Sequence, residues 1–310
     1  MRVLVTGGAG FIGSHTVALL VAEGHEVVIL DDLSTGKRAN LTGLPVELVV
    51  GSITDVLLVE RVVAGCSHVL HLAARPSVPG SCDDPVGYDA VNVHGAVVVF
   101  EAARRAGVRQ LAYASSSAVY GASEVVPKLE TMPVDVLSPY AAAKAACELY
   151  ARTYTSSLGL PCVGLRYFNV FGPRQDPNGA YAAVIPRFVS FAVAGEPLTV
   201  FGDGEQERDF VSVADVARAN LAALTTPSAA GGVYNIGTGR GLTLNRLIAA
   251  IRAQVTRPVS VVHDPPRVGD VRVSLADVSA ARAALGWAPQ ADFDAALAQV
   301  IAWFATGEGA

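Results

Sequence analysis

Several features that mark common classes of protein are scarce in this sequence. Its 310 residues include only four cysteines, without the paired spacing of a disulfide framework, which favours a reducing compartment. A formal net charge of −5 leaves no basic surface for nucleic acid. Hydrophobic residues make up 51% of the chain but fall in short runs, so no membrane-spanning helix is expected. Because the first apolar run follows Met1-Arg2 directly, we expect no signal peptide and a cytoplasmic protein.

Metal and acyl-transfer chemistry are also poorly represented. The six histidines do not fall in the clustered Cys, His, Asp and Glu spacing of a zinc site, so no metal is predicted. His68 and His71 share one apolar run and are more typical of strand residues with local partners. The sequence around Ser116 lacks the Gly-x-Ser-x-Gly form of a nucleophile elbow, which argues against acyl transfer.

The amino-terminal part contains a glycine-punctuated turn between a strand pattern and a helix pattern. Val3-Leu4-Val5 is a short apolar run, and Gly7, Gly10 and Gly13 follow it. Apolar residues then recur at helical spacing through 17–21. The glycines allow a tight turn and a close approach of the backbone to a pyrophosphate, which would lie on the positive end of the helix. This order predicts a dinucleotide-binding site.

A second strand pattern, at 26–30, ends in two acidic residues, Asp31 and Asp32. They stand at the distance from the glycine turn where a carboxylate holds the hydroxyls of the adenosine ribose. A carboxylate would repel a 2′-phosphate, so the pattern favours NAD over NADP. The alternative is that two acids simply open a surface loop.

Tyr140 and Lys144 form the most informative pair in the sequence. If the stretch after Pro139 is helical, four residues make just over one turn, so the phenol and the ammonium emerge on the same face. An ordinary phenol titrates at about 10 and is a poor base at neutral pH, but a neighbouring ammonium favours the phenolate. The pair therefore predicts a general base, although the same spacing also occurs by chance in surface helices.

Upstream of this pair, the run 113–121 has the pattern of a strand whose carboxyl end opens into a loop of hydroxyl side chains. Ligands of open α/β sheets collect at that end of the strands. Strand and helix patterns alternate up to about residue 165, and loops rich in glycine and proline follow. Long helical patterns cover 91–105 and 139–158.

The glycine motif at 5–13, the Ser-Pro-Tyr140-Ala-Ala-Ala-Lys144 segment and the Gly269-Asp270 region carry a family resemblance. The sequence resembles the extended short-chain dehydrogenase/reductases and, within them, the nucleotide-sugar 4-epimerases. The resemblance implies an α/β fold with a doubly wound parallel sheet (Rossmann) and a smaller C-terminal α/β substrate domain. It places the NAD-binding domain at 1–166, with later segments interleaved, and the substrate domain at 167–310. It also implies a homodimer joined by a four-helix bundle of the two long helical patterns.

The resemblance assigns roles to individual residues. Ser116, Tyr140 and Lys144 would be catalytic, with Ser116 sharing the hydrogen bond to the reacting sugar oxygen. The residues it assigns to NAD are Gly7, Gly10, Phe11, Ile12, Gly13, Asp31, Asp32, Ser34, Thr35, Gly36, Ser52, Ile53, Leu72, Ala73, Ala74, Asn92, Tyr140, Lys144, Tyr167 and Phe168. Those assigned to the UDP-sugar are Ser77, Ser116, Ser117, Tyr140, Asn169, Val184, Arg208, Arg267, Asp270 and Ser274. Taken alone, Asn92 could equally be a polar core residue with satisfied hydrogen bonds.

The expected reaction is reversible 4-epimerisation of a UDP-hexose. The related sugar dehydratases carry an acid pair after the catalytic hydroxyl residue, whereas this sequence has Ser117 and Ala118, so elimination lacks its proton donor. In epimerisation, Tyr140 takes the O4 proton while hydride passes to NAD, and the 4-keto sugar turns over before hydride returns. NAD should therefore copurify with the protein.

Ser274 stands where a bulky tyrosine restricts some of these epimerases to glucose and galactose, so N-acetylated sugars are expected to fit. Ser52 replaces an aspartate that often meets the adenine, and Pro76 replaces a lysine found close to the cofactor in some members. A UDP-glucuronate 4-epimerase is the enzymatic alternative, and it would need a cation such as Arg75 for the C6 carboxylate. The non-enzymatic alternative is a module that senses NAD or a nucleotide sugar.

Overall fold

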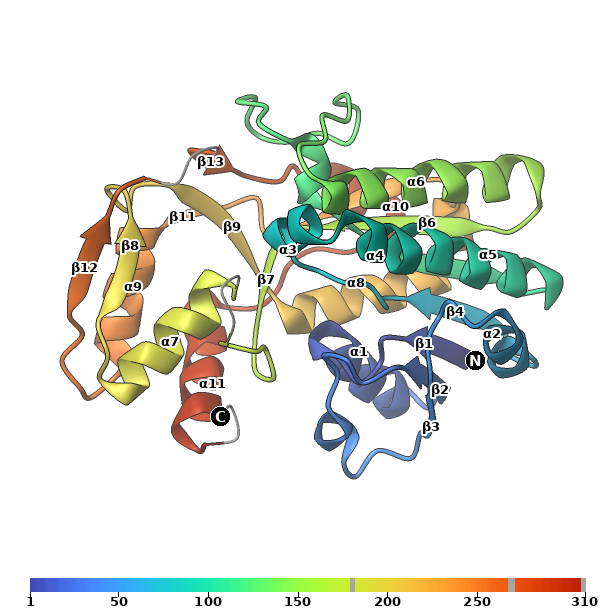
Figure 1. Cartoon of the computed structure of the whole chain (residues 1–310), viewed down its shortest axis with the longest axis horizontal. Coiled ribbons are helices and arrows are strands. Elements are labelled where there is room, and N and C mark those ends of the chain that lie inside the picture. The colour runs from blue at the N-terminus through green and yellow to red at the C-terminus, as the bar shows by residue number, and fades with distance from the viewer. Residues whose placement is uncertain (179–181, 267–270, 308–310) are drawn as a thin grey trace.

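The structure is a computed structural model that describes residues 1–178, 182–266 and 271–307. Its centre is a seven-stranded parallel sheet in the order β10-β6-β5-β4-β1-β2-β3 (Figure 1). These strands are β1 (Arg2–Thr6), β2 (Glu26–Asp31), β3 (Glu47–Val50), β4 (His68–His71), β5 (Gln110–Ser116), β6 (Cys162–Tyr167) and β10 (Val233–Ile236). The order reverses beside β1, as in a doubly wound sheet, which confirms the predicted fold class.

Helices cover both faces of this sheet, and each face has its own hydrophobic core. Neighbouring residues of β1 point to opposite sides, so Val3 and Val5 enter one core and Leu4 the other. The first core is closed by α1 (Phe11–Ala22), α8 (Val213–Thr225) and α10 (Ser279–Leu285). The second is closed by α2 (Val56–Val63), α5 (Ala96–Arg105) and α6 (Pro139–Ser157). Burial on both sides explains why the strands read as continuous apolar runs.

A smaller α/β part stands beside the main sheet, on the left in Figure 1. In it, β9 pairs with β7, β11 and β13, and β8 pairs with β12. The strands are β7 (Asn169–Phe171), β8 (Leu198–Phe201), β9 (Glu207–Ser212), β11 (Gly241–Thr243), β12 (Val261–Asp264) and β13 (Val273–Ser274). Helices α7 (Val184–Ala194), α9 (Leu244–Gln254) and α11 (Phe293–Ala305) close a third hydrophobic core.

The two parts are interleaved along the chain. Helix α8, strand β10 and helix α10 all follow residue 166 and yet belong to the main sheet and its first core. The short elements that remain are η1 (Arg38–Leu41), α3 (Val78–Asp83), α4 (Pro85–Asp89), η2 (Ala90–Gly95), η3 (Ser117–Tyr120) and η4 (Pro227–Ala229). The wider π-helical turn η2 begins the pattern predicted at 91–105, and α5 continues it.

The start of α6 follows directly from its sequence. Ser138 is the N-cap, and its side chain accepts a hydrogen bond from the backbone N–H of Ala141 at 3.1 Å. Pro139 is the first helical residue, where its missing N–H costs nothing. Tyr140 is therefore held in the first turn of a long helix that lies on the main sheet.

Candidate active site

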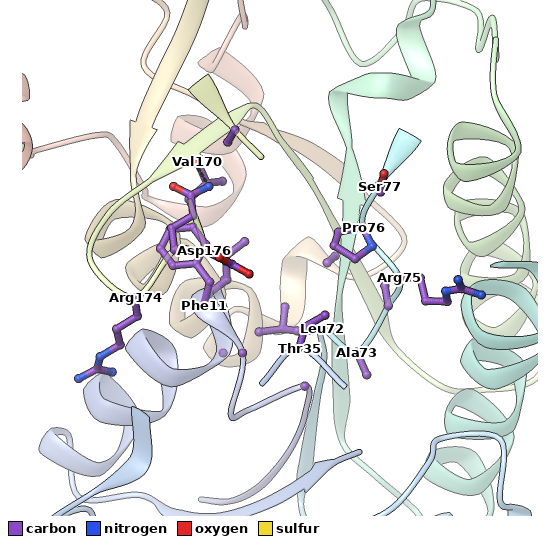
Figure 2. Close-up of a pocket in the computed structure, with 18 of the residues that line it drawn as sticks. Phe11, Thr35, Leu72, Ala73, Arg75, Pro76, Ser77, Val170, Arg174 and Asp176 are labelled. Atoms are coloured by element: carbon purple, nitrogen blue, oxygen red, sulfur yellow. Dashed lines mark hydrogen bonds between the residues drawn. The ribbon is translucent and has the colours of Figure 1, made fainter. Parts of the chain in front are cut away.

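A cavity of about 1480 Å³ opens at the carboxyl ends of the parallel strands. Both parts of the molecule line it: Gly7 and Tyr140 from the main sheet and its helices, Val184, Phe210 and Trp303 from the smaller part. Figure 2 shows Phe11 and Arg174 on one side of it and the segment 75–77 on the other. This is the edge of an open α/β sheet where ligands bind.

The glycine turn forms one end of the cavity. Gly7 has φ +72°, a conformation that side-chain-bearing residues rarely adopt, and a Cβ there would lie 2.7 Å from the backbone nitrogen of Ala73. A Cβ on Gly13 would lie 2.0 Å from the carbonyl oxygen of Gly7, so the turn and α1 touch closely. Gly10 is the N-cap of α1 and offers no side chain to the first-turn N–H groups. Those groups can therefore serve an anion.

Asp31 orients the loop beside this turn. It is only 6% exposed, and its carboxylate accepts hydrogen bonds at 2.9 Å from the backbone N–H groups of Ala9 and Leu33. Burial raises the pKa of Asp31, and these hydrogen bonds act in the opposite direction. Asp32 accepts from Ser34 in the same loop. Gly36 packs against Asp31, where a Cβ would lie 2.7 Å from Oδ1.

Tyr140 and Lys144 both line the cavity, on one face of α6 as their spacing predicts. The Lys144 ammonium is buried, lies 5.8 Å from the centre of the Tyr140 ring, and donates a hydrogen bond to the carbonyl of Ala114 at 2.8 Å. Ser116 reaches the cavity from the end of β5, and its hydroxyl accepts from the N–H of Ala118 at 3.2 Å. The three predicted catalytic side chains therefore share one wall of the cavity.

A buried ionic network supports that wall from behind. Ser115 donates to the Glu148 carboxylate at 2.5 Å, and Arg166 binds the same carboxylate through two nitrogens at 2.9 and 2.7 Å. Arg166 also donates to the hydroxyl of Tyr120 at 2.9 Å. Because Glu148 lies one turn after Lys144 on α6, the helix is bound to β5 at two successive turns.

Most residues predicted to contact NAD line the cavity. These are Gly7, Gly10, Phe11, Ile12, Gly13, Asp31, Asp32, Ser34, Thr35, Ile53, Leu72, Ala73, Ala74, Tyr140, Lys144, Tyr167 and Phe168. Tyr167 donates to the side chain of Asn220 at 2.5 Å, and burial raises its pKa, so its phenol stays protonated. Gly36, Ser52 and Asn92 lie behind the lining.

Ser52 and Asn92 have structural partners. Ser52 bonds the hydroxyl of Thr54 at 2.8 Å, while its neighbours Gly51 and Ile53 line the cavity. The Asn92 side chain accepts from the backbone N–H of Arg75 at 2.8 Å and donates to the carbonyl of Arg75 at 3.0 Å. Asn92 therefore clamps a loop of the cavity wall, in agreement with the alternative that it is a satisfied polar core group.

The predicted UDP-sugar residues divide into three groups. Ser77, Ser116, Tyr140, Asn169 and Val184 line the cavity. Ser117, Arg208 and Ser274 lie outside the lining, and Ser274 pairs in register with Arg208 where β13 meets β9. Arg267 and Asp270 lie outside the described residues.

The sequence interpretation missed several residues of the cavity. Arg174 and Asp176 line it from the loop after β7, and Trp303 lines it from α11. The glycine- and proline-rich composition of 172–179 indicated a functional loop but did not single out these side chains. No pattern in the sequence places Trp303 at the cavity.

The residues of the cavity fit NAD. The close glycine turn leaves room for a diphosphate at the start of α1, Asp31 stands at the end of β2, and Tyr140 and Lys144 stand at the far end. Within the described ranges, there is no group of three or more His, Cys, Asp or Glu side chains that could hold a metal ion. The described helices also include none long and apolar enough to cross a membrane.

Fold and cavity together define a dinucleotide-binding α/β enzyme with a Tyr-Lys pair. Residues 3–237 match the NAD dependent epimerase/dehydratase family, and the chain belongs to that family. This match confirms the family resemblance that was inferred from the sequence. It also confirms NAD as the expected cofactor.

Individual relatives extend this finding over the whole chain. A UDP-glucose 4-epimerase of Mycolicibacterium smegmatis is 43% identical, covering 98% of each chain. The structure of the UDP-N-acetylglucosamine 4-epimerase of Methanobrevibacter ruminantium has a TM-score of 0.94 and 40% identity, covering 99% of this chain and 98% of the other. The UDP-glucose 4-epimerase of Thermus thermophilus, in complex with NAD, has a TM-score of 0.90 and 41% identity, covering 98% of this chain and 99% of the other.

Proposed function

We propose that this protein is an NAD-dependent UDP-sugar 4-epimerase that interconverts UDP-N-acetylglucosamine with UDP-N-acetylgalactosamine, and UDP-glucose with UDP-galactose. The observation that carries the proposal is the shared wall of Ser116, Tyr140 and Lys144 at the end of a cavity that begins at the glycine turn. The relatives are named for sugars of both kinds.

In the proposed reaction, the Tyr140 phenolate removes the proton from the sugar O4 and later returns it. The Lys144 ammonium lies 5.8 Å from the ring centre and is fixed by the carbonyl of Ala114, so a positive charge stands beside the proposed base. Ser116 donates a hydrogen bond to the same oxygen. The bound nicotinamide supplies reversible oxidation at C4. Substrate residues around Asn169 and Val184 would hold the nucleotide sugar while the keto sugar turns.

The UDP-glucuronate alternative loses support in this structure. It requires a cation that can bind the C6 carboxylate, and Arg75 is the candidate from the sequence. Arg75 is instead paired with Asp84 at 2.6 Å, and its guanidinium lies 4.3 Å from the centre of the Tyr88 ring. Figure 2 shows its side chain directed away from Pro76 and Ser77. We therefore favour a hexose without a carboxylate as the substrate.

The proposed acceptance of N-acetylated sugars rests on Ser274. Its side chain is small and half-buried, and it stands on β13 just after the segment 267–270. By the family resemblance, a small residue here enlarges the pocket beside the C2 substituent. The M. ruminantium neighbour, named for UDP-N-acetylglucosamine, supports this acceptance.

We also propose that the protein is a homodimer. Val86 on α4 is 79% exposed, and Leu149 on α6 is 67% exposed, on two helices that contact each other. A second copy packed on α5 and α6 would cover such side chains. Sedimentation at micromolar concentration should give a dimer, and a monomer would contradict this arrangement.

A cytoplasmic location stays a prediction, in keeping with the free cysteines of the protein, of which three are buried.

Proton NMR of the purified protein with UDP-N-acetylglucosamine, and separately with UDP-glucose, tests the proposal. The anomeric signal of the galacto product should appear with both sugars, without any added acceptor. A Ser274→Tyr variant should keep the reaction with UDP-glucose and lose most of that with UDP-N-acetylglucosamine. If bound NAD is present and neither sugar changes, the hexose assignment is wrong.

A further inference from the structure

Ser81 on α3 makes a hydrogen bond to the backbone of Tyr140 across 59 residues of sequence. Ser81 is completely buried, and its hydroxyl oxygen lies 3.0 Å from the Tyr140 nitrogen, whose N–H it accepts. The hydroxyl proton goes to the carbonyl of Val78 at 2.5 Å. With its donor committed in this way, the oxygen has a lone pair directed to Tyr140.

The first turn of α6 needs such a partner. Pro139 has no N–H, Ala141 donates to the side chain of Ser138, and Ala142 donates to the carbonyl of Ser138. The N–H of Tyr140 lies too early in the helix to find an acceptor within it. Ser81 therefore completes the cap from a different helix, and it does so at the residue that carries the proposed base.

Helix α3 begins in the wall of the cavity. Ser77, its N-cap, lines the cavity, accepts from the N–H of Gly80 at 3.0 Å, and receives the N–H of Ser81 on its carbonyl at 3.1 Å. The segment just before α3 is fixed by the clamp of Asn92 on the backbone of Arg75. Ser77, Ser81 and Tyr140 thus form a short, hydrogen-bonded connection between one wall of the cavity and another.

We propose that Ser81 is a positioning residue for Tyr140, which fixes the distance from the proposed base to the wall that carries Ser77. The proposal rests on the proposed function for its kinetic consequence. Because Ser81 does not line the cavity, it acts through the backbone of Tyr140 and does not touch the ligand. Its loss should misplace the phenol by a fraction of an ångström to about 1 Å, which is enough to slow a positioned proton transfer.

The test compares Ser81→Ala, Ser81→Thr and a control, Ser67→Ala, in the NAD-bound protein. Ser67 also donates from its hydroxyl to a backbone carbonyl, that of Arg2 at 3.1 Å, but at the amino end of β4. Ser81→Ala should lower kcat about 10- to 100-fold with less than about a threefold change in KM. Ser81→Thr should restore at least a part of kcat, and Ser67→Ala should leave it unchanged.

Amide hydrogen exchange gives a readout that does not depend on activity. In Ser81→Ala, the Tyr140 amide should exchange at least about 10-fold faster, while the amides of Ala141 and Ala142 keep their protection. Normal kcat in Ser81→Ala, or loss of protection along the whole of α6, would overturn the proposal. If the unmodified protein converts no UDP-hexose, the proposed function fails, and hydrogen exchange still decides whether Ser81 fixes Tyr140.

Discussion

The two ends of the cavity differ in how they are built. The end at the glycine turn is made largely by the backbone of one strand-turn-helix unit, in which Gly13 packs closely on the main chain of Gly7 and Gly8. The opposite end gathers side chains from several distant segments, among them Asn169, Val184 and Trp303. A site built from local backbone geometry can therefore be predicted from the sequence. A site built from residues that are distant in the sequence can be recognised only once the fold is known. Tyr140 and Lys144 stand at this opposite end, and they are an exception to the rule, because their spacing on one helix is local.

The largest effect should come from removing the proposed base. Tyr140→Phe should keep NAD bound and lower kcat about 10²- to 10⁴-fold, the usual contribution of general acid–base catalysis. Single-turnover and steady-state rates with UDP-glucose would measure it, with NAD content after purification as the control. Near-normal turnover would show that another group takes the O4 proton.

The network behind the base should matter for stability. Glu148 and Arg166 have side chains only 10% and 5% exposed, and Glu148→Gln would leave the arginine charge without its partner. The free energy of unfolding should fall by about 3–5 kcal/mol, as for other broken buried pairs. Urea unfolding can measure this against Glu60→Gln, which removes an exposed pair with Arg105 and should cost less than about 1 kcal/mol. Equal losses in the free energy of unfolding would show that the buried network stabilises the protein no more than an exposed ion pair does.

The glycine end can be tested by adding a single methyl group. In Gly13→Ala the new Cβ would meet the Gly7 carbonyl at 2.0 Å, so the turn must open. Overpacking typically costs about 1–3 kcal/mol, so NAD affinity should fall about 10- to 100-fold. Gly24→Ala is the control, because its Cβ has open space around it, although its φ of +75° makes the change mildly destabilising. Calorimetric titration of NAD into the two variants, after removal of bound NAD, would measure both affinities. Equal affinities would show that the close packing at Gly13 does not matter for NAD binding.

His71 ends β4, is hydrogen-bonded to the hydroxyl of Thr6, and gives a smaller, pH-dependent effect. Burial, together with the charge of Lys144, lowers the pKa of His71 from 6.5 to about 3 in the folded protein. Below pH 6.5 the unfolded chain binds this proton and the folded chain does not, so stability falls as the pH falls toward 3. At pH 5 the loss should be about 2 kcal/mol relative to pH 7. Urea unfolding of His71→Gln should show a shallower dependence between these pH values; an unchanged slope would exclude His71 as its source.

The same contrast explains which features of the fold and the site can be predicted from the sequence. The alternation of strands and helices, the glycine turn and the Tyr140-Lys144 face follow from periodicity and from turn chemistry, which are local. Asn92 was assigned to the cofactor through resemblance, whereas its amide binds the backbone of Arg75, a contact between a helix and a loop that no local pattern encodes. The contact between Ser81 and the backbone of Tyr140 is likewise not encoded in a local pattern, because the two residues are 59 positions apart.

Reversible oxidation at C4, with Tyr140 as the base, is the chemistry that we propose for the cavity. The most direct measurement uses UDP-N-acetylglucosamine deuterated at C4, incubated with the protein in ordinary water and followed by NMR. The galacto product should keep its deuterium, because the deuteride that leaves C4 is returned to C4 within the same site. Product that contains hydrogen from the solvent at C4 would contradict it.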